Sequence, residues 1–362
     1  MARTRALAAA VLASALALTP ASAAAFGTIE GGGQHREHER ITRAALACRT
    51  AVEPGADCFE PKSMDQLAGH ARTFGAVGSP DSTEVADPAA HCDDADFLDG
   101  GGYPRTREQA TAALRNCVDH LRRRFGEAVR SSGGVLDADG RIIDAEVSVD
   151  PDCELAPKDE PRAKCEAIEA FGRALHGVQD FHSRSNWADE ADPGRSSGPG
   201  NPPGLNLPAP SPVLDLRGTG VPAVPRELST GCFVLKDTIP GTGVCAGRVT
   251  HAALNKDNGL VDPGTGDATE PTTPRGLVRT NFAKAVTGAV VETRHQWQDF
   301  QGALEESYGA ERGARIACAL THDTPATECR ARAGGSGRTV LVVFFAGVVV
   351  AGLGLGWGLR RR

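Results

Sequence analysis

The sequence predicts a mainly α-helical domain that lies between an export signal and a C-terminal transmembrane helix. Apolar residues recur near the 3.6-residue helical period in residues 37–48, 106–130, 162–181 and 274–308. Connectors rich in Gly, Pro and Asp separate these segments and are typical of turns. The chain shows no internal repeat, so we expect residues 26–320 to form a single domain.

The N-terminal 25 residues resemble a secretory signal peptide. Two arginines precede an apolar run from Ala6 to Leu18, and small residues follow as far as Ala25. We therefore expect residues 1–25 to be removed and Phe26 to become the first residue of the mature protein.

The C-terminal segment predicts a membrane anchor. Residues 339–359 carry no charge and precede three arginines at 360–362, which favours a single transmembrane helix with a cytoplasmic tail. A buried amphipathic helix is the alternative, but residues 340–350 offer no polar face. With a stalk at residues 321–338, the protein is expected to be exported and held in the cell membrane with its N-terminal domain outside.

Two segments depart from the helical pattern. Residues 135–150 alternate between apolar and polar side chains, which predicts one or two short strands. Residues 192–231 are rich in Pro, Gly and Ser and predict a long irregular insertion between two helical blocks.

All ten cysteines lie between the predicted signal and the predicted anchor, where disulfides persist. Sequence alone leaves the connectivity open. The pairing that closes only short local loops is the one we favour: Cys48/Cys58, Cys92/Cys117, Cys153/Cys165, Cys232/Cys245 and Cys318/Cys329. No Cys-x-x-Cys occurs, which argues against cysteine ligands for zinc.

His176 and Asp180 are four residues apart in a predicted helix, so both side chains lie on one face. An imidazole and a carboxylate held side by side suit zinc. His38, Asp81 and His91 precede them in the chain and are candidates for further ligands. The net charge of −7 gives no basic surface for nucleic acid, so no nucleic-acid partner is expected.

Residues 172–187, with Gly-Arg-Ala-Leu-His-Gly-Val-Gln-Asp-Phe-His-Ser-Arg-Ser-Asn-Trp, resemble the signature of the zinc-dependent phospholipase C and P1 nuclease superfamily, especially its HET-C-like branch. Two other segments, His-Glu-Arg-Ile-Thr-Arg-Ala-Ala-Leu and His-Ala-Ala-Leu-Asn-Lys-Asp, are similar to the actinobacterial CinY proteins. The resemblance spans residues 26–300 through scattered motifs, of which the central one is specific.

This resemblance implies a helical domain with up to three zinc ions and with the mature N-terminal residue as a ligand. Phe26 and His38 would share one ion with Asp180, and Asp81, His91, His176 and Asp180 would hold a second. Asp81 would also accept a proton during catalysis.

The third ion is where this chain departs from the family, because Arg184 replaces a histidine of the motif and arginine does not ligate zinc. His182 could substitute only if the helix has ended before it. His251 and Asp257 are further candidate ligands, although Asn255 stands where related phospholipases have glutamate. We therefore expect two zinc ions rather than three, with Arg184 replacing the third charge and holding a substrate phosphate.

The sequence thus favours an exported, membrane-anchored zinc-dependent phosphoester hydrolase, similar to phospholipase C, that uses a metal-activated water on a phospholipid or another phosphodiester. The alternative is a catalytically inactive, metal-stabilised protein that binds lipid or a partner on the same scaffold. A single-strand nuclease is disfavoured because three Trp and two Tyr provide few stacking platforms.

Overall fold

The computed structural model describes residues 26–49, 58–71, 73–156, 161–220, 223–233 and 243–329. The predicted signal, residues 1–25, the predicted transmembrane helix, residues 339–359, and the predicted tail, residues 360–362, lie outside these residues. Within them, no helix combines the length and the apolar character that a membrane crossing requires. The described residues belong to one compact unit, which includes residues 321–329 at the expected start of the stalk.

The described chain is mainly helical, as predicted, and the four long patterns correspond to four helices. These are α2 (Glu37–Leu46), α6 (Arg107–Ser132), α8 (Ala163–Arg184) and α10 (Asn281–Tyr308). Helix α10 begins seven residues later than predicted, because Arg279 has a φ of 51° and so interrupts any helix before Asn281.

Shorter helices complete the fold. They are α3 (Pro61–Ala68), α4 (Gly75–Gly78), α5 (Pro80–Thr83), α7 (Asp144–Val147), α9 (His251–Leu254), α11 (Ala310–Thr321) and α12 (Pro325–Glu328), with 3-10 turns η1 (Gly133–Val135), η2 (Pro212–Leu214) and η3 (Gly243–Cys245). Two antiparallel pairs of two-residue strands accompany them: β1 (Glu30–Gly31) with β2 (Gln34–His35), and β3 (Leu260–Val261) with β4 (Ala268–Thr269).

The prediction of strands in residues 135–150 is wrong. The segment contains η1, one isolated bridge between Leu136 and Ile142, and α7. Gly140, at a φ of 77°, turns the chain back after four residues, so the alternating side chains reach the core from a loop.

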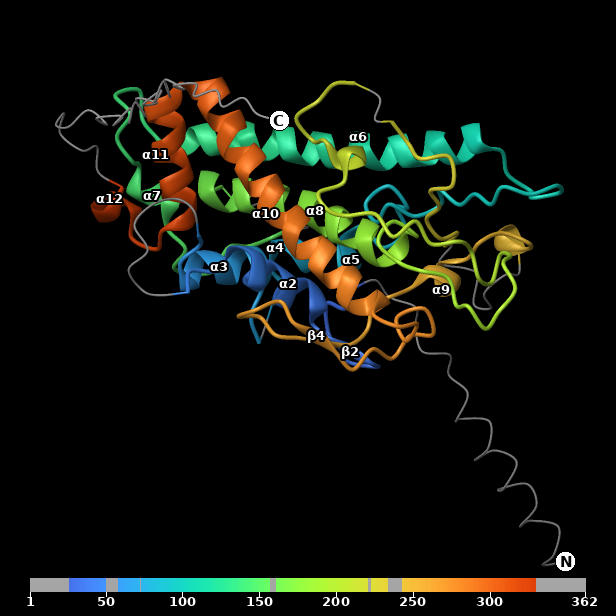
Figure 1. Cartoon of the computed structure of the whole chain (residues 1–362). Coiled ribbons are helices and arrows are strands. Elements are labelled where there is room, and N and C mark those ends of the chain that lie inside the picture. Colours follow the sequence, from blue (N-terminus) through green and yellow to red (C-terminus); the bar gives the residue numbers. More distant parts are fainter. Residues whose placement is uncertain are drawn as a thin grey trace, which may run out of the picture. The chain divides into compact units, whose positions relative to one another are not determined.

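Helix α8 lies at the centre of the fold, and α6 and α10 both pack against it (Figure 1). Every residue from Phe171 to Arg184 is buried, including its histidines and charged side chains. On the apolar side, Phe171 contacts Phe300 of α10 at a ring distance of 4.8 Å, and Phe125 of α6 meets Phe300 at 5.4 Å. This packing makes α8 a rigid support for any polar side chain that it carries.

The start of α8 anchors the C-terminal part of the described chain. The buried Lys164 Nζ donates to Ser63 Oγ on α3 at 2.8 Å and to the His322 carbonyl oxygen at 2.6 Å. Burial lowers the pKa of Lys164 to about 7, although the nearby carboxylates of Asp323, Glu60 and Glu328 oppose the shift.

All five predicted disulfides are present: Cys48–Cys58, Cys92–Cys117, Cys153–Cys165, Cys232–Cys245 and Cys318–Cys329. They are compatible with an exported protein. In the described part of residues 192–231 the chain is irregular, as predicted, with the turn η2 as its helical element. The buried Asp189 precedes this part and pairs with Arg275 and Lys256, which fixes where the excursion begins.

Candidate metal centre

His176 and Asp180 project from one face of α8, one helical turn apart, and both are completely buried. The two side chains lie close to each other, with 3.0 Å between His176 Nε2 and Asp180 Oδ2. Both face α2 and the chain around α4 and α5, which bring the remaining donors to α8.

Helix α2 contributes His38 in its first turn. Its Nε2 lies 3.3 Å from Asp180 Oδ1, and its ring stacks on that of His176 with 4.3 Å between centroids. His38, His176 and Asp180 therefore form a first group in which one ligand atom from each lies within 4.8 Å of the others.

The loop after α5 contributes His91, whose Nδ1 lies 2.9 Å from His176 Nε2 and 3.0 Å from Asp180 Oδ2. Gly177 permits this approach, because a Cβ at that position would lie 2.6 Å from the Ala90 carbonyl oxygen. Asp81 of α5 completes a second group, Asp81, His91 and His176, with its Oδ1 3.7 Å from His176 Nε2. Asp180 Oδ1 thus faces His38, while Asp180 Oδ2 faces His91 and His176.

Hydrogen bonds to neighbouring groups orient two of the imidazoles. His176 Nδ1 donates to the Val77 carbonyl oxygen at 2.8 Å, which in the neutral ring assigns the lone pair to Nε2. His38 Nδ1 donates to Gln179 Oε1 at 2.8 Å, while Gln179 Nε2 donates to Thr42 Oγ1 and Thr293 Oγ1. The lone pairs of both Nε2 atoms are therefore directed at Asp180.

The donor set fits a zinc ion. Among the described residues, the buried atoms His38 Nε2, His91 Nε2 and Asp180 Oδ1 have no hydrogen-bond partner. His38 Nε2 and Asp180 Oδ1 lie 3.3 Å apart, and a cation between two such buried acceptors would remove the cost of leaving them without a donor. Nitrogen and carboxylate oxygen are ligands that zinc prefers.

The electrostatics of the pair agree with this arrangement. Burial raises the pKa of Asp180, but the charges of Arg184 and His176 outweigh it and hold this pKa well below its usual range. Burial lowers the pKa of His176, yet the Asp180 and Asp81 carboxylates outweigh it and raise this pKa. Asp180 is thus a carboxylate, and a bound metal would displace the proton from His176.

Phe26 lies beside this centre. It is fully buried, and its ring meets the His38 ring edge-on at 5.9 Å. Backbone contacts hold the segment: Gly27 N–H donates to Glu37 Oε2 at 2.9 Å, and His38 N–H donates to the Gly27 carbonyl oxygen. Burial raises the pKa of Glu37 to about 7, against the lowering effect of its backbone donors.

Arg184 fills the space next to Asp180, where the resemblance implied a third ion. Its Nη1 lies 2.5 Å from Asp93 Oδ2, and its Nη2 lies 3.3 Å from Asp180 Oδ2. Asp93 was not among the residues predicted from the sequence. The signal that could have identified it is its position two residues after the candidate ligand His91. Both Nη atoms are engaged by carboxylates, so Arg184 presents no free two-pronged fork in this arrangement.

His251 and Asp257 lie close to Asp93, the partner of Arg184, and belong to neither histidine group. His251 Nε2 lies 3.2 Å from Asp257 Oδ2, and its Nδ1 lies 3.6 Å from Asp93 Oδ1. Burial lowers the pKa of His251, but Asp257 and Asp93 outweigh it and raise this pKa to about 9. Both Asp257 oxygens are buried without a hydrogen-bond partner among the described residues.

His182 is not part of either group. Helix α8 continues past it to Arg184, so its side chain leaves on another face, where Nε2 lies 3.4 Å from Glu292 Oε2 of α10. Its ring also fills the space above Gly288, where a Cβ would lie 2.6 Å from His182 Nδ1.

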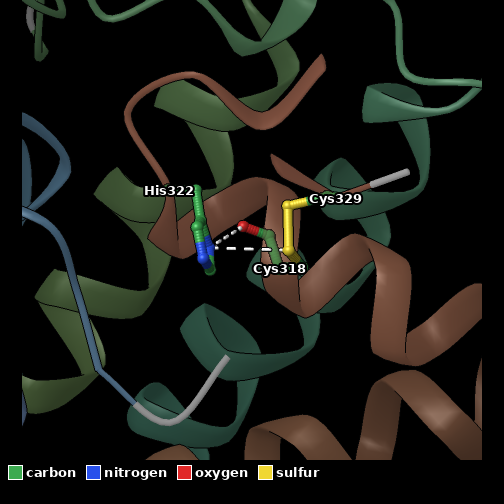
Figure 2. Close-up of side chains that lie close together, drawn as sticks. All are labelled: Cys318, His322 and Cys329. Carbon is green, nitrogen blue, oxygen red and sulfur yellow. Dashed lines mark hydrogen bonds between the residues drawn. A yellow bond between two sulfur atoms is a disulfide. The ribbon is translucent and has the colours of Figure 1, made fainter. Parts of the chain in front are cut away.

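A further set of close side chains, Cys318, His322 and Cys329, does not provide a metal site. Figure 2 shows that the two sulfur atoms are bonded to each other in a disulfide, so neither is a free thiolate. His322 Nδ1 lies 3.0 Å from the Cys318 carbonyl oxygen and is therefore also occupied.

No protein-family model, no curated protein and no solved structure matches this chain.

Proposed function

We propose that the protein is a phosphoester hydrolase that holds two zinc ions around Asp180. The observation that carries the proposal is the position of the buried Asp180 carboxylate between two sets of donors. Its Oδ1 lies 3.3 Å from His38 Nε2, and its Oδ2 lies 3.0 Å from both His91 Nδ1 and His176 Nε2. His38 and Asp180, with Phe26 beside them, would hold one ion, and Asp81, His91, His176 and Asp180 would hold the other.

Two zinc ions held by these residues would supply Lewis-acid chemistry toward the oxygens of a phosphoester. The chain's own residues contribute the rest. Asp81 is 19% exposed, whereas His176 and Asp180 are fully buried, so substrate approaches from the α5 side. The Asp81 carboxylate is placed to accept a proton from an attacking water.

Arg184 contributes a fixed positive charge next to the centre. Its pairing with Asp93 and Asp180 keeps the guanidinium in place without a metal ion. This fixed position supports a centre with two metal ions and one permanent cation, Arg184, which acts on the substrate through its charge.

A phospholipid is the substrate class that we favour, because the predicted anchor at residues 339–359 would hold the domain beside a membrane. Export and membrane attachment belong to this proposal. Vesicles of a zwitterionic phospholipid and a soluble phosphodiester would separate a lipid substrate from a general phosphodiesterase activity.

The test is metal content of the full chain, purified in detergent, measured by mass spectrometry with hydrolysis of both substrates. We expect two zinc ions per chain in the wild type and none in the double variant His176→Ala, Asp180→Ala. His120→Ala removes another buried histidine and should retain both ions. A wild-type chain without stoichiometric metal would refute the proposal.

A second candidate function is a metal-stabilised protein that binds lipid or a partner without turnover. The paired state of Arg184 favours it, because a guanidinium held by two carboxylates is less able to reach substrate. Two bound zinc ions together with binding to the same vesicles, but no hydrolysis of either substrate, would select this function.

A further inference from the structure

The segment from Phe26 to Thr28 contacts both donor groups at once. Phe26 packs against His38 of the first group. Two residues later, Thr28 Oγ1 donates a hydrogen bond to Asp81 Oδ2 of the second group. Thr28 is 7% exposed, so this contact is shielded from water.

Asp81 depends on this contact more than the other donors depend on theirs. It lies on α5, a single turn from Pro80 to Thr83, and it is the most exposed of the five donor side chains. Among the described residues, Thr28 is the one hydrogen-bond donor to its carboxylate. His176, by comparison, is enclosed in α8 and fixed by the Val77 carbonyl oxygen.

Thr28 itself is held firmly. Its methyl group lies against Gly78 at the end of α4, where an added Cβ would approach Thr28 Cγ2 to 2.7 Å. The residues on either side are fixed by the backbone, since Gly27 N–H donates to Glu37 and the Ile29 carbonyl oxygen accepts from Arg36 N–H at 3.1 Å. The Thr28 hydroxyl can therefore donate to Asp81 with little loss of conformational entropy.

We propose that Thr28 is a positioning residue for Asp81. By occupying Oδ2, the hydroxyl turns Oδ1 toward His176 and His91 and leaves a single oxygen for the centre. A hydrogen bond behind a ligating carboxylate orients it and strengthens metal binding. The inference rests on the proposed zinc centre and names a residue on which one of its two ions depends.

The experiment measures zinc affinity of the full chain by competition with a chromophoric chelator. Thr28→Val keeps the shape of the side chain and removes the donor, while Thr28→Ser keeps the donor and removes the methyl group. We expect Thr28→Val to retain two ions but to bind one of them about 10- to 100-fold more weakly. Thr28→Ser should stay close to the wild type.

A double-mutant cycle separates positioning from folding. In an Asp81→Ala background, Thr28→Val should produce no further loss of affinity, because its partner is already absent. Equal weakening in Thr28→Val and Thr28→Ser, or wild-type affinity in Thr28→Val, would overturn the role of Thr28 while the zinc centre stands. Absence of zinc from the wild type would overturn the centre and this inference together.

Discussion

At the scale of single residues, the geometry of the candidate metal centre depends on side chains that lie outside its donor groups. Gln179 accepts from His38 Nδ1 and cannot turn over, because both hydrogens of its amide are held by Thr42 and Thr293. The lone pair of His38 Nε2 is therefore directed at Asp180 before any ion arrives.

Gln179→Leu should weaken zinc binding about 10- to 100-fold, because His38 loses the acceptor that fixes its tautomer. Chelator competition measures the change. Gln66→Leu is the matched control, since Gln66 is also a buried glutamine, but its partners are the Lys62 carbonyl oxygen, Asp152 and the Cys153 N–H. Equal zinc affinity in the Gln179 variant and the control would contradict the role of Gln179.

Arg184→His should raise the metal content of the chain by one ion. The substitution removes the resident cation and leaves a nitrogen ligand near Asp93, with His251 and Asp257 close by. Mass spectrometry of the folded variant measures the content, and Arg184→His combined with His251→Ala should return to the wild-type value. A single variant with unchanged content would show that these side chains do not form a donor set.

At the scale of elements, α8 carries both the candidate metal centre and Lys164, the residue that fixes the chain after α11. Lys164, at its first turn, holds α3 and the chain after α11 through Ser63 and the His322 carbonyl oxygen. The folded pKa of about 7 lies below the ordinary value of 10.5, so the unfolded chain binds more protons between these values. Stability therefore rises with pH across this window and is lowest below pH 7, where the buried amine is charged.

Lys164→Met should remove this contribution. In urea unfolding between pH 7 and pH 10, the free energy of unfolding of the wild type should rise with pH. Lys164 should contribute up to about 1.4 kcal/mol per pH unit to this rise. The variant should lack that rise. Parallel curves for the two proteins would contradict the burial effect at Lys164.

The side chains that could be placed together from the sequence are those on one face of a single helix. His176 and Asp180 share a face of α8, so their proximity followed from the 3.6-residue period alone. Asp93 and Thr28 escaped notice because they lie on irregular chain, where no period connects them to α8. In residues 135–150, alternation marked the buried side chains correctly, but a loop with one bridge can bury them as well as a strand.

At the scale of the whole molecule, helix packing brings distant segments together, whereas the disulfides join near ones. The widest of the five bridges, Cys92–Cys117, spans 25 residues and ties the chain next to His91 to α6. The bridge Cys318–Cys329 is the last of the five along the chain and spans 11 residues.

Replacing both cysteines of either bridge by serine should lower the free energy of unfolding by about 2–4 kcal/mol. Only Cys92→Ser with Cys117→Ser should also weaken zinc binding, because His91 adjoins Cys92. Urea unfolding and chelator competition measure the two effects separately. If removal of Cys318–Cys329 weakened zinc binding as much, the link between the first bridge and His91 would be wrong.

The five bridges follow one another along the chain without crossing. Each cysteine is bonded to the cysteine that comes next in the sequence, from Cys48 with Cys58 to Cys318 with Cys329. In a chain that enters an oxidising compartment N-terminus first, the correct partner is thus always the next thiol to arrive. Oxidation can then proceed bridge by bridge during delivery, without reshuffling of wrong pairs. Four of the five bridges can form before α10 has emerged to close the core, and Cys318–Cys329 follows α10.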